Sequence, residues 1–270
     1  MKTKLILLAA AALSICGCSQ PEEAAEIKVF AAASMKASLN EAIAKYKTAH
    51  PNIEVVAYYE SSGTLQVQIE NAADECDLFI SAGAKQMNAL QEKGLIDVES
   101  RFNILENQVT LCVPESNPHN ITSFQVLSEK LKSGSYGDFM LGLGGPTVPV
   151  GQYSSKILEY YQIDEASLVA AGVVTYGKNV TEVASFIKNA SVSAGIVYKT
   201  DAFTHELKVV DAATKEMCGQ VLYPAALIKN NNGEKTKNAA DKFLRYLTNS
   251  EAMESFNKVG FVAACEPKAL

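Results

Sequence analysis

The sequence predicts an α/β protein built from two smaller domains. Strand patterns alternate with amphipathic helix patterns from Ile27 onward, which is typical of a mainly parallel sheet with helices on both faces. About ten strands are expected, more than one open sheet holds comfortably, so two such domains are favoured. The chain has 270 residues, of which 48% are hydrophobic, enough for two ordinary cores.

Each expected element follows from its local pattern. Strands are expected from Ile27 and at Glu54–Tyr59, Asp77–Ser81, Gln108–Val113, Phe139–Leu143, Val173–Tyr176, Ala194–Tyr198, Lys208–Val210 and Gln220–Ile228. Helices are expected after Ser34 and at Thr64–Ala73, Lys85–Glu92, Phe124–Lys132, Tyr153–Tyr161, Val180–Asn189, Lys235–Thr248 and Glu251–Lys258.

The first strand runs through three alanines into Ser34, where a helix with Leu39 and Ala42 on its apolar face begins. Free backbone N–H groups, the Ser34 hydroxyl and the positive end of the helix dipole together favour an anion there. Ser34 is also a good N-cap, and capping alone explains it. Both interpretations stay open for this stretch alone.

Three further junctions resemble the first, at Glu60–Thr64, Pro149–Gly151 and Gly177–Val180. Each has an ordinary explanation, because Ser and Asn cap helices, Gly turns and Pro breaks. Ligands of open α/β sheets lie beyond the carboxyl ends of the strands, and two facing domains would enclose a cleft lined by helix N-termini. The four junctions together therefore favour one shared anion site.

The N-terminal segment is expected to direct export. Residues 1–17 combine Lys2 and Lys4 with an apolar run too short to cross a bilayer, as in a signal peptide. The following Cys18 completes a segment that resembles a bacterial lipobox, and residues 18–26 form a short tether behind it. The protein is expected outside the cytoplasm, lipid-anchored through Cys18 on the outer face of the membrane and otherwise soluble.

Charge and cysteine usage exclude some partners. The signal peptide contains two lysines and no acid, so 22 basic residues oppose 30 acidic ones in the mature chain, a net charge of −8. Nucleic acid is therefore not an expected partner. The spacing of Cys76, Cys112, Cys218 and Cys265 does not suit zinc but permits two disulfides, with Cys112–Cys218 a plausible pair.

Enzyme signatures are weak in this chain. His50, His119 and His205 all lie in polar surroundings, so a serine triad has no obvious base. The glycines at 142–145 would need another glycine where Thr147 stands to form a dinucleotide motif. Neither an enzyme activity nor a cofactor is expected.

Several segments resemble the molybdate-binding proteins of ABC transporters. They include VFAAASMKASLNEAIAKY, SSGTLQVQIE followed by DLFISAGAKQMNAL, PVGQYSSKIL, GIVYKTDA, YPAALIK and FLRYLTNSEAMESFNKVGF, and the resemblance covers nearly all of residues 27–264. It implies a periplasmic-binding-protein type II fold, with two α/β lobes joined by two crossing segments. It also implies a monomer that carries molybdate or tungstate to an ABC permease and its ATPase subunits.

The resemblance also implies an anion site without charged side chains. By motif, Ser34 and Ser62 supply hydroxyls and amides, Val150 and Val180 supply main-chain amides, and Tyr198 supplies a phenol hydroxyl. Molybdate and tungstate are fully deprotonated near neutral pH, so a site made only of donors suits them, whereas hydrogen phosphate needs an acceptor. Sulfate has to be excluded by pocket size.

One residue departs from the family pattern. Glu60 stands where many members have a glycine or another small residue, and a carboxylate would repel a dianion unless it points to solvent. Residues 27–112 and 219–270 are expected to form the first lobe and residues 113–218 the second. Hinges are expected near Val109–Val113 and Gly219–Pro224.

Three alternatives stay open. The same fold could bind sulfate, thiosulfate or a small organic acid. The chain could be an exported hydrolase with Ser34 or Ser62 as nucleophile, which needs a base that the sequence does not reveal. It could also be a surface lipoprotein without a ligand.

Overall fold

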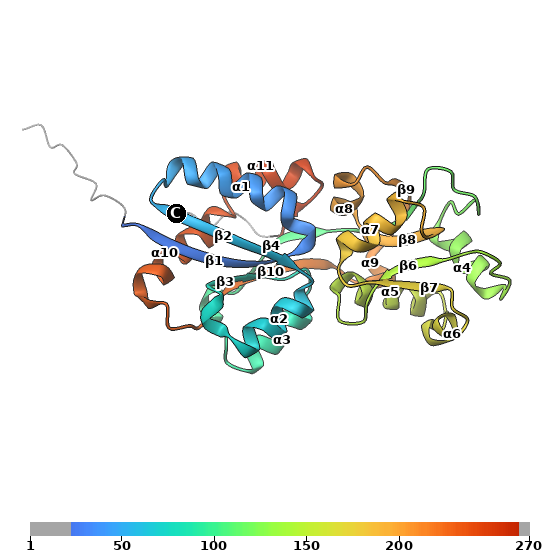
Figure 1. Cartoon of the computed structure of the whole chain (residues 1–270), viewed down its shortest axis with the longest axis horizontal. Coiled ribbons are helices and arrows are strands. Elements are labelled where there is room, and N and C mark those ends of the chain that lie inside the picture. Colours follow the sequence, from blue (N-terminus) through green and yellow to red (C-terminus); the bar gives the residue numbers. More distant parts are fainter. Residues whose placement is uncertain (1–22, 265–270) are drawn as a thin grey trace, which may run out of the picture.

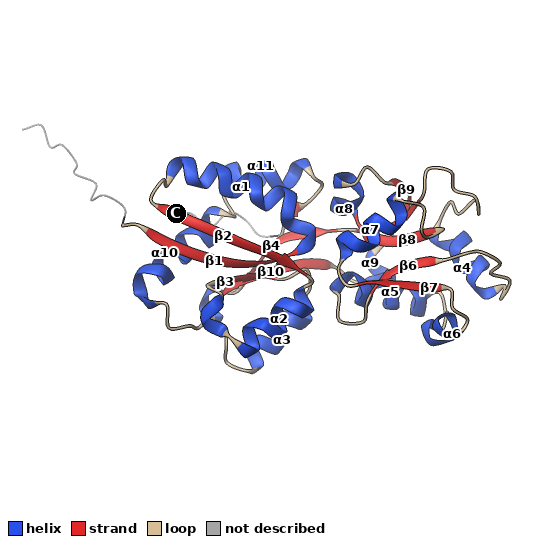
Figure 2. Ribbon diagram, in the orientation of Figure 1, coloured by secondary structure: helices blue, strands red, loops and turns tan. Residues whose placement is uncertain are grey.

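The computed structural model describes residues 23–264, which form two lobes arranged along the long axis of the molecule (Figure 1). Each lobe contains one sheet with helices packed on it (Figure 2), so the predicted two-lobed α/β class is confirmed. The expected mainly parallel strand direction is wrong, because β10 in the first sheet and β5 in the second pair antiparallel with their neighbours. The predicted signal peptide, Cys18 and Cys265 lie outside the described residues.

The first lobe holds a six-stranded mixed sheet in the order β11-β4-β10-β3-β1-β2. Its strands are β1 (Ala25–Ala32), β2 (Ile53–Glu60), β3 (Leu78–Ile80), β4 (Phe102–Asn107), β10 (Val221–Leu227) and β11 (Val262–Ala263). β1 is parallel to β2 and β3, whereas β10 is antiparallel to β3 and β4. β10 tolerates Pro224 because its register with β4 shifts between Tyr223 and Pro224.

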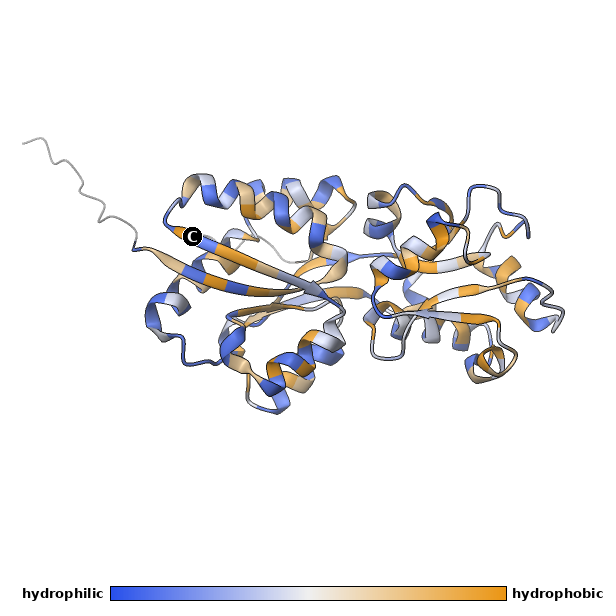
Figure 3. Ribbon diagram, in the orientation of Figure 1, coloured by the Kyte–Doolittle hydropathy of each residue, from blue (hydrophilic) through white to orange (hydrophobic). Residues whose placement is uncertain are grey.

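Helices cover both faces of this sheet. One face carries α1 (Lys36–Ala49), α10 (Gly233–Tyr246) and α11 (Ser250–Lys258), and the other carries α2 (Ser62–Asn71) and α3 (Ala84–Glu92). Three 3-10 turns lie between these elements, η1 (Ala33–Met35), η2 (Ala73–Glu75) and η3 (Val98–Ser100). β1 alternates between the two faces, because Val29 packs in the cluster of Leu39 from α1 and Phe30 in that of Leu65 from α2. Apolar residues accordingly follow the strands, and polar ones alternate with them along the helices (Figure 3).

The second lobe holds a five-stranded mixed sheet in the order β7-β6-β8-β5-β9. Its strands are β5 (Val109–Val113), β6 (Leu141–Gly144), β7 (Val174–Gly177), β8 (Ala194–Tyr198) and β9 (Lys208–Ala212). Its helices are α4 (Phe124–Lys132), α5 (Pro149–Tyr160), α6 (Glu165–Ala170), α7 (Val180–Lys188), α8 (Lys199–Thr204) and α9 (Lys215–Cys218). The three strands β7, β6 and β8 are parallel, and β5 is antiparallel to β8 and β9.

The chain crosses between the lobes twice, from β4 into β5 and from α9 into β10. Asn107 lies opposite Val221 in the first sheet, so the two crossings leave that sheet side by side. The structure corrects the predicted lobe boundaries: Val109–Cys112, expected in the first lobe, pair within the second sheet, and β1 begins at Ala25, inside the expected tether. An apolar run alone does not reveal which sheet it will join.

The predicted Cys112–Cys218 disulfide is wrong, because both residues are free thiols, as is Cys76. Cys112 lies in β5 with its sulfur 3.7 Å from the Thr110 hydroxyl, whereas Cys218 lies in α9 against the Thr214 carbonyl. Burial raises the pKa of the Cys112 thiol to about 12, which keeps it protonated. Among residues 23–264, none of the helices combines the length and apolarity that a membrane crossing requires.

Candidate functional site

A small pocket lies between the lobes where strands of both sheets end and helices begin. Its lining is Ala32, Ala33, Ser34, Glu60, Ser61, Ser62, Ala82, Val148, Pro149, Val150, Val180 and Tyr198. The volume that the centre of a water-sized sphere can occupy in this pocket is ≈ 10 Å³. Adding the radius of the sphere gives a hollow roughly 2.7 Å in radius. Such a pocket suits one small ion and is far below the size of drug-sized ligand sites.

The structure brings all five predicted site residues together in this pocket. Ser34 and Ser62 come from the first lobe, and Val150, Val180 and Tyr198 come from the second. Any guest therefore contacts both lobes, and binding favours the closed arrangement of the lobes.

The Ser34 hydroxyl does not cap a helix. Ser34 lies inside the 3-10 turn η1, and neither η1 nor α1 has a side-chain cap. Its Oγ instead lies 2.8 Å from the phenol oxygen of Tyr223, a residue of β10. Of the two interpretations open at the sequence level, capping is therefore excluded, and a polar role in the pocket is favoured.

The neighbouring serines Ser61 and Ser62 have different hydrogen-bonding roles. Ser61 is the N-cap of α2, and its Oγ accepts the Thr64 N–H at 3.2 Å. Ser62 is thus free of capping, and its Oγ accepts the Ala82 N–H at 3.0 Å inside the pocket wall. That bond uses one of the two lone pairs of the oxygen and leaves the hydroxyl hydrogen of Ser62 available to donate to a guest.

Val150 and Val180 each place the start of a helix at the pocket. Val150 lies in the first turn of α5 behind Pro149, and the N-cap position of α5 has no side-chain cap. Val180 begins α7, whose N-cap Asn179 accepts only the Glu182 N–H at 3.0 Å. N–H groups in a first helical turn have no intrahelical acceptor, so both helix starts present donors and positive dipole ends to the pocket.

Tyr198 closes the pocket from the end of β8. Its phenol donates to the Ala82 carbonyl at 3.4 Å, a long contact across the lobes. Burial, together with the neighbouring phenols of Tyr223 and Tyr153, raises the pKa of Tyr198 well above its usual range. The phenol therefore stays protonated and remains a donor.

Glu60, the departure noted in the sequence, lines the pocket but also joins the lobes. Its Oε2 accepts the Nδ2–H of Asn179 at 3.1 Å and the Ser61 N–H at 3.2 Å. Glu60 is half-buried, so it does not point freely into solvent. It is the one charged residue of the pocket lining, which contains no lysine or arginine.

Sequence reasoning missed the polar chain behind Ser34. Asn107, at the end of β4, donates through Nδ2 to the Tyr223 hydroxyl at 3.1 Å and to the Thr200 hydroxyl at 2.9 Å. All three residues are nearly or fully buried. The sequence pattern around each one is explained by the packing of its strand or helix, so it does not reveal that their side chains meet. The only local signal is a polar Asn at a buried strand end.

Asp201 is a buried carboxylate at the other end of this chain. Burial raises its pKa from 3.8 to about 7, against the lowering effect of the Thr200 hydroxyl, which lies 3.4 Å from its Oδ2. Burial raises the pKa of the Tyr223 phenol, and the negative charge of Asp201 raises it further. At neutral pH this carboxyl is near its midpoint of titration.

The raised pKa of Asp201 predicts that stability falls as pH rises. The folded state keeps the proton where the unfolded chain has released it, so the stabilisation is complete below pH 3.8 and is lost through about pH 7. Asp201→Asn should therefore exceed the wild type in unfolding free energy by roughly 2–4 kcal/mol at mildly alkaline pH and by little under acidic conditions. Urea unfolding across pH measures this difference, and parallel pH profiles of the two proteins would contradict the assignment.

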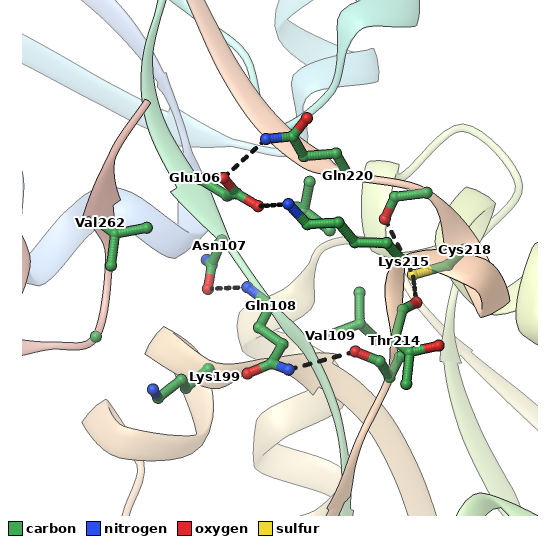
Figure 4. A pocket seen from close by; sticks show the side chains of 14 residues that line it. Glu106, Asn107, Gln108, Val109, Lys199, Thr214, Lys215, Cys218, Gln220 and Val262 are labelled. Atoms are coloured by element: carbon green, nitrogen blue, oxygen red, sulfur yellow. Dashed lines mark hydrogen bonds and ion pairs between the residues drawn. The ribbon is translucent and has the colours of Figure 1, made fainter. Parts of the chain in front are cut away.

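A second, larger cavity of ≈ 240 Å³ lies at the two crossing segments (Figure 4). Glu106 there pairs with Lys215 at 3.3 Å and accepts from Gln220 at 2.8 Å, while Gln108 donates to the Ala213 carbonyl at 3.3 Å. These bonds connect the two crossings to each other.

No group of three or more potential metal-ligating side chains occurs among residues 23–264.

Comparison with known proteins identifies similar sequences and folds. Residues 27–262 match the family model described as bacterial extracellular solute-binding protein. YvgL of Bacillus subtilis, described as a candidate ABC transporter substrate-binding lipoprotein, is 32% identical over 93% of this chain and 94% of its own. The molybdate-binding protein ModA of Haemophilus influenzae is 30% identical over 88% and 91%. The periplasmic molybdate-binding protein of Azotobacter vinelandii superposes with a TM-score of 0.73 at 20% identity, over 87% and 98% of the chains.

Proposed function

Because the chain belongs to the family of bacterial extracellular solute-binding proteins that serve ABC transporters, we propose that it captures molybdate or tungstate and delivers it to an import permease and its ATPase subunits. Its relatives are solute-binding proteins rather than enzymes, and the bound anion is cargo rather than a cofactor. The observation that carries the proposal is the convergence of uncharged donors from both lobes on one ion-sized pocket.

The chemistry of the pocket favours an anion without protons. Ser34, Ser62 and Tyr198 bring hydroxyls, and the helix starts at Val150 and Val180 bring main-chain N–H groups. Hydrogen bonds to a charged acceptor are roughly twice as strong as neutral ones, so neutral donors hold a dianion well. The absence of lysine and arginine from the lining keeps the bound anion releasable.

The proposal includes the location and state of the protein. We infer an exported monomer, held on the outer face of the membrane by lipid on Cys18, with the lobes opening at the two crossing segments. The N-terminal sequence and the description of YvgL as a lipoprotein support the anchor. Cys18→Ala should release the mature protein from the membrane fraction.

A second candidate ligand is hydrogen phosphate, and Glu60 is the observation that favours it. A carboxylate in the pocket lining is an acceptor for the proton that this anion carries. However, Oε2 of Glu60 already accepts from Asn179 and Ser61, which leaves one oxygen for a guest.

Isothermal titration of the purified protein with molybdate, tungstate, sulfate and phosphate tests the function. Molybdate or tungstate should bind at least about 100-fold more tightly than sulfate or phosphate, a difference of about 2.7 kcal/mol. Thermal unfolding should shift upward with the same anions. Preferential binding of phosphate would support the second candidate, and the absence of binding to every tetrahedral anion would overturn both.

Glu60→Gln gives opposite results for the two candidates. The glutamine keeps an acceptor oxygen for Asn179 but removes the negative charge, so molybdate should bind about tenfold more tightly at low ionic strength. The gain should shrink as salt screens the charge. Hydrogen phosphate should instead bind more weakly. Glu92→Gln, an exposed acid at the end of α3, is the control and should change neither affinity.

A further inference from the structure

We propose that Tyr223 and Asn107, which lie behind the pocket, orient the Ser34 hydroxyl as a donor and thereby make the site select anions that carry no proton. Neither residue belongs to the pocket lining, so both are positioning residues. The proposal rests on the proposed function, because it concerns the same anion site.

The orientation of the Asn107 amide is determined by its neighbours. The Gln108 N–H donates to Oδ1 at 2.8 Å, which identifies this atom as the oxygen. The Nδ2 group then faces the hydroxyls of Thr200 at 2.9 Å and Tyr223 at 3.1 Å. A flipped amide would place its N–H₂ group against the Gln108 N–H and leave both hydroxyls without this donor.

The direction of the next bond follows from the amide. Nδ2 can only donate, so the Tyr223 oxygen accepts from Asn107, and the phenol hydrogen has to find another acceptor. The phenol of Tyr223 is fully buried, and Ser34 Oγ at 2.8 Å is the one acceptor for it among the bonds of residues 23–264. The reverse bond, from Ser34 to Tyr223, would leave the phenol hydrogen buried and unsatisfied, which is costly.

Tyr223 therefore donates to Ser34, and the Ser34 hydrogen has to leave in another direction, toward the pocket that Ser34 lines. Ser62 is held in the same state, because its oxygen accepts the Ala82 N–H. Each serine hydrogen is thus free of the protein bond that its oxygen accepts and can donate to a guest. Sulfate and molybdate accept both hydrogens, whereas an O–H group of hydrogen phosphate that faces either serine would meet a donor where it needs an acceptor.

Tyr223→Phe tests the inference, with sulfate and hydrogen phosphate as a matched pair. At mildly alkaline pH both are dianions of similar size, and only phosphate carries a proton. Their affinities are measured by competition against bound molybdate. In the wild type sulfate should be preferred, and in Tyr223→Phe the preference should fall about tenfold, because the phenol no longer holds the Ser34 hydroxyl as a donor.

Two further variants make the result specific. Tyr246→Phe removes a phenol that donates to the Ala42 carbonyl, remote from the pocket, and should leave the preference unchanged. Asn107→Asp offers Tyr223 a new acceptor and should lower the preference as Tyr223→Phe does; its added charge affects the two dianions equally. Wild-type preference in both Tyr223→Phe and Asn107→Asp, with molybdate still bound, would overturn the inference alone. Loss of every oxyanion from the wild type would instead overturn the proposed function.

Discussion

Gly63→Ala is expected to weaken molybdate binding by about 100-fold or more, because it holds the lobes apart. Gly63 lies in the first turn of α2, and a Cβ there would overlap the carbonyl oxygen of Thr147 in the second lobe and come within 3.2 Å of its Cβ. The obstacle is backbone, which cannot rotate away. Opening removes the donors of Val150, Val180 and Tyr198 from the guest, and two lost hydrogen bonds to an ion already account for a factor of this size.

Gly83→Ala is the matched control. Gly83 also faces the second lobe, but a Cβ there would meet Pro149 at 3.5 Å, an ordinary contact. Its affinity should stay close to that of the wild type. Calorimetry measures both variants, and small-angle scattering with saturating molybdate should show Gly63→Ala as the more extended protein. Tight binding by a compact Gly63→Ala protein would show that the lobes do not close at this contact.

Removing both serine hydroxyls should almost abolish anion binding. Ser34→Ala and Ser62→Ala each delete a donor to a charged guest, worth about 1–3 kcal/mol. The double variant should lose roughly 2–5 kcal/mol, somewhat less than the sum if the anion shifts toward the remaining donors. Calorimetry at fixed pH and salt measures each loss.

Ser38→Ala serves as the control for the serine variants. Ser38 is buried in α1 and donates to the Met35 carbonyl at 3.2 Å, outside the pocket. Its binding should equal that of the wild type. Unchanged affinity in both Ser34→Ala and Ser62→Ala would remove these residues from the proposed anion site.

The pocket could be predicted because its residues lie at local junctions between strand and helix. Ser34 lies two residues after the end of β1, Ser62 two residues after β2 and Val180 three residues after β7, so the alternation of patterns places all three at carboxyl ends of strands. Sequence alone left the role of Ser34 open between capping and binding. The structure decides against capping because the hydroxyl contacts Tyr223 instead.

The partners behind the pocket could not be predicted, because they are brought together by sheet pairing. Tyr223 is 189 positions from Ser34 and 116 from Asn107 along the chain. The sequence does not predict strand β4, which carries Asn107, because FNILEN alternates poorly between polar and apolar residues. β5 is predicted in the wrong lobe for a different reason, because its apolar run fits either sheet equally well.

The adjacency of the two crossings limits how the molecule can move. Because Asn107 lies opposite Val221 where the chain leaves the first sheet, we expect both connections to bend about one common line. The relative motion of the lobes should then approximate a swing with a single degree of freedom, with twisting resisted by the paired strands. One inter-dye distance across the mouth of the molecule would consequently report the entire trajectory between its empty and loaded forms.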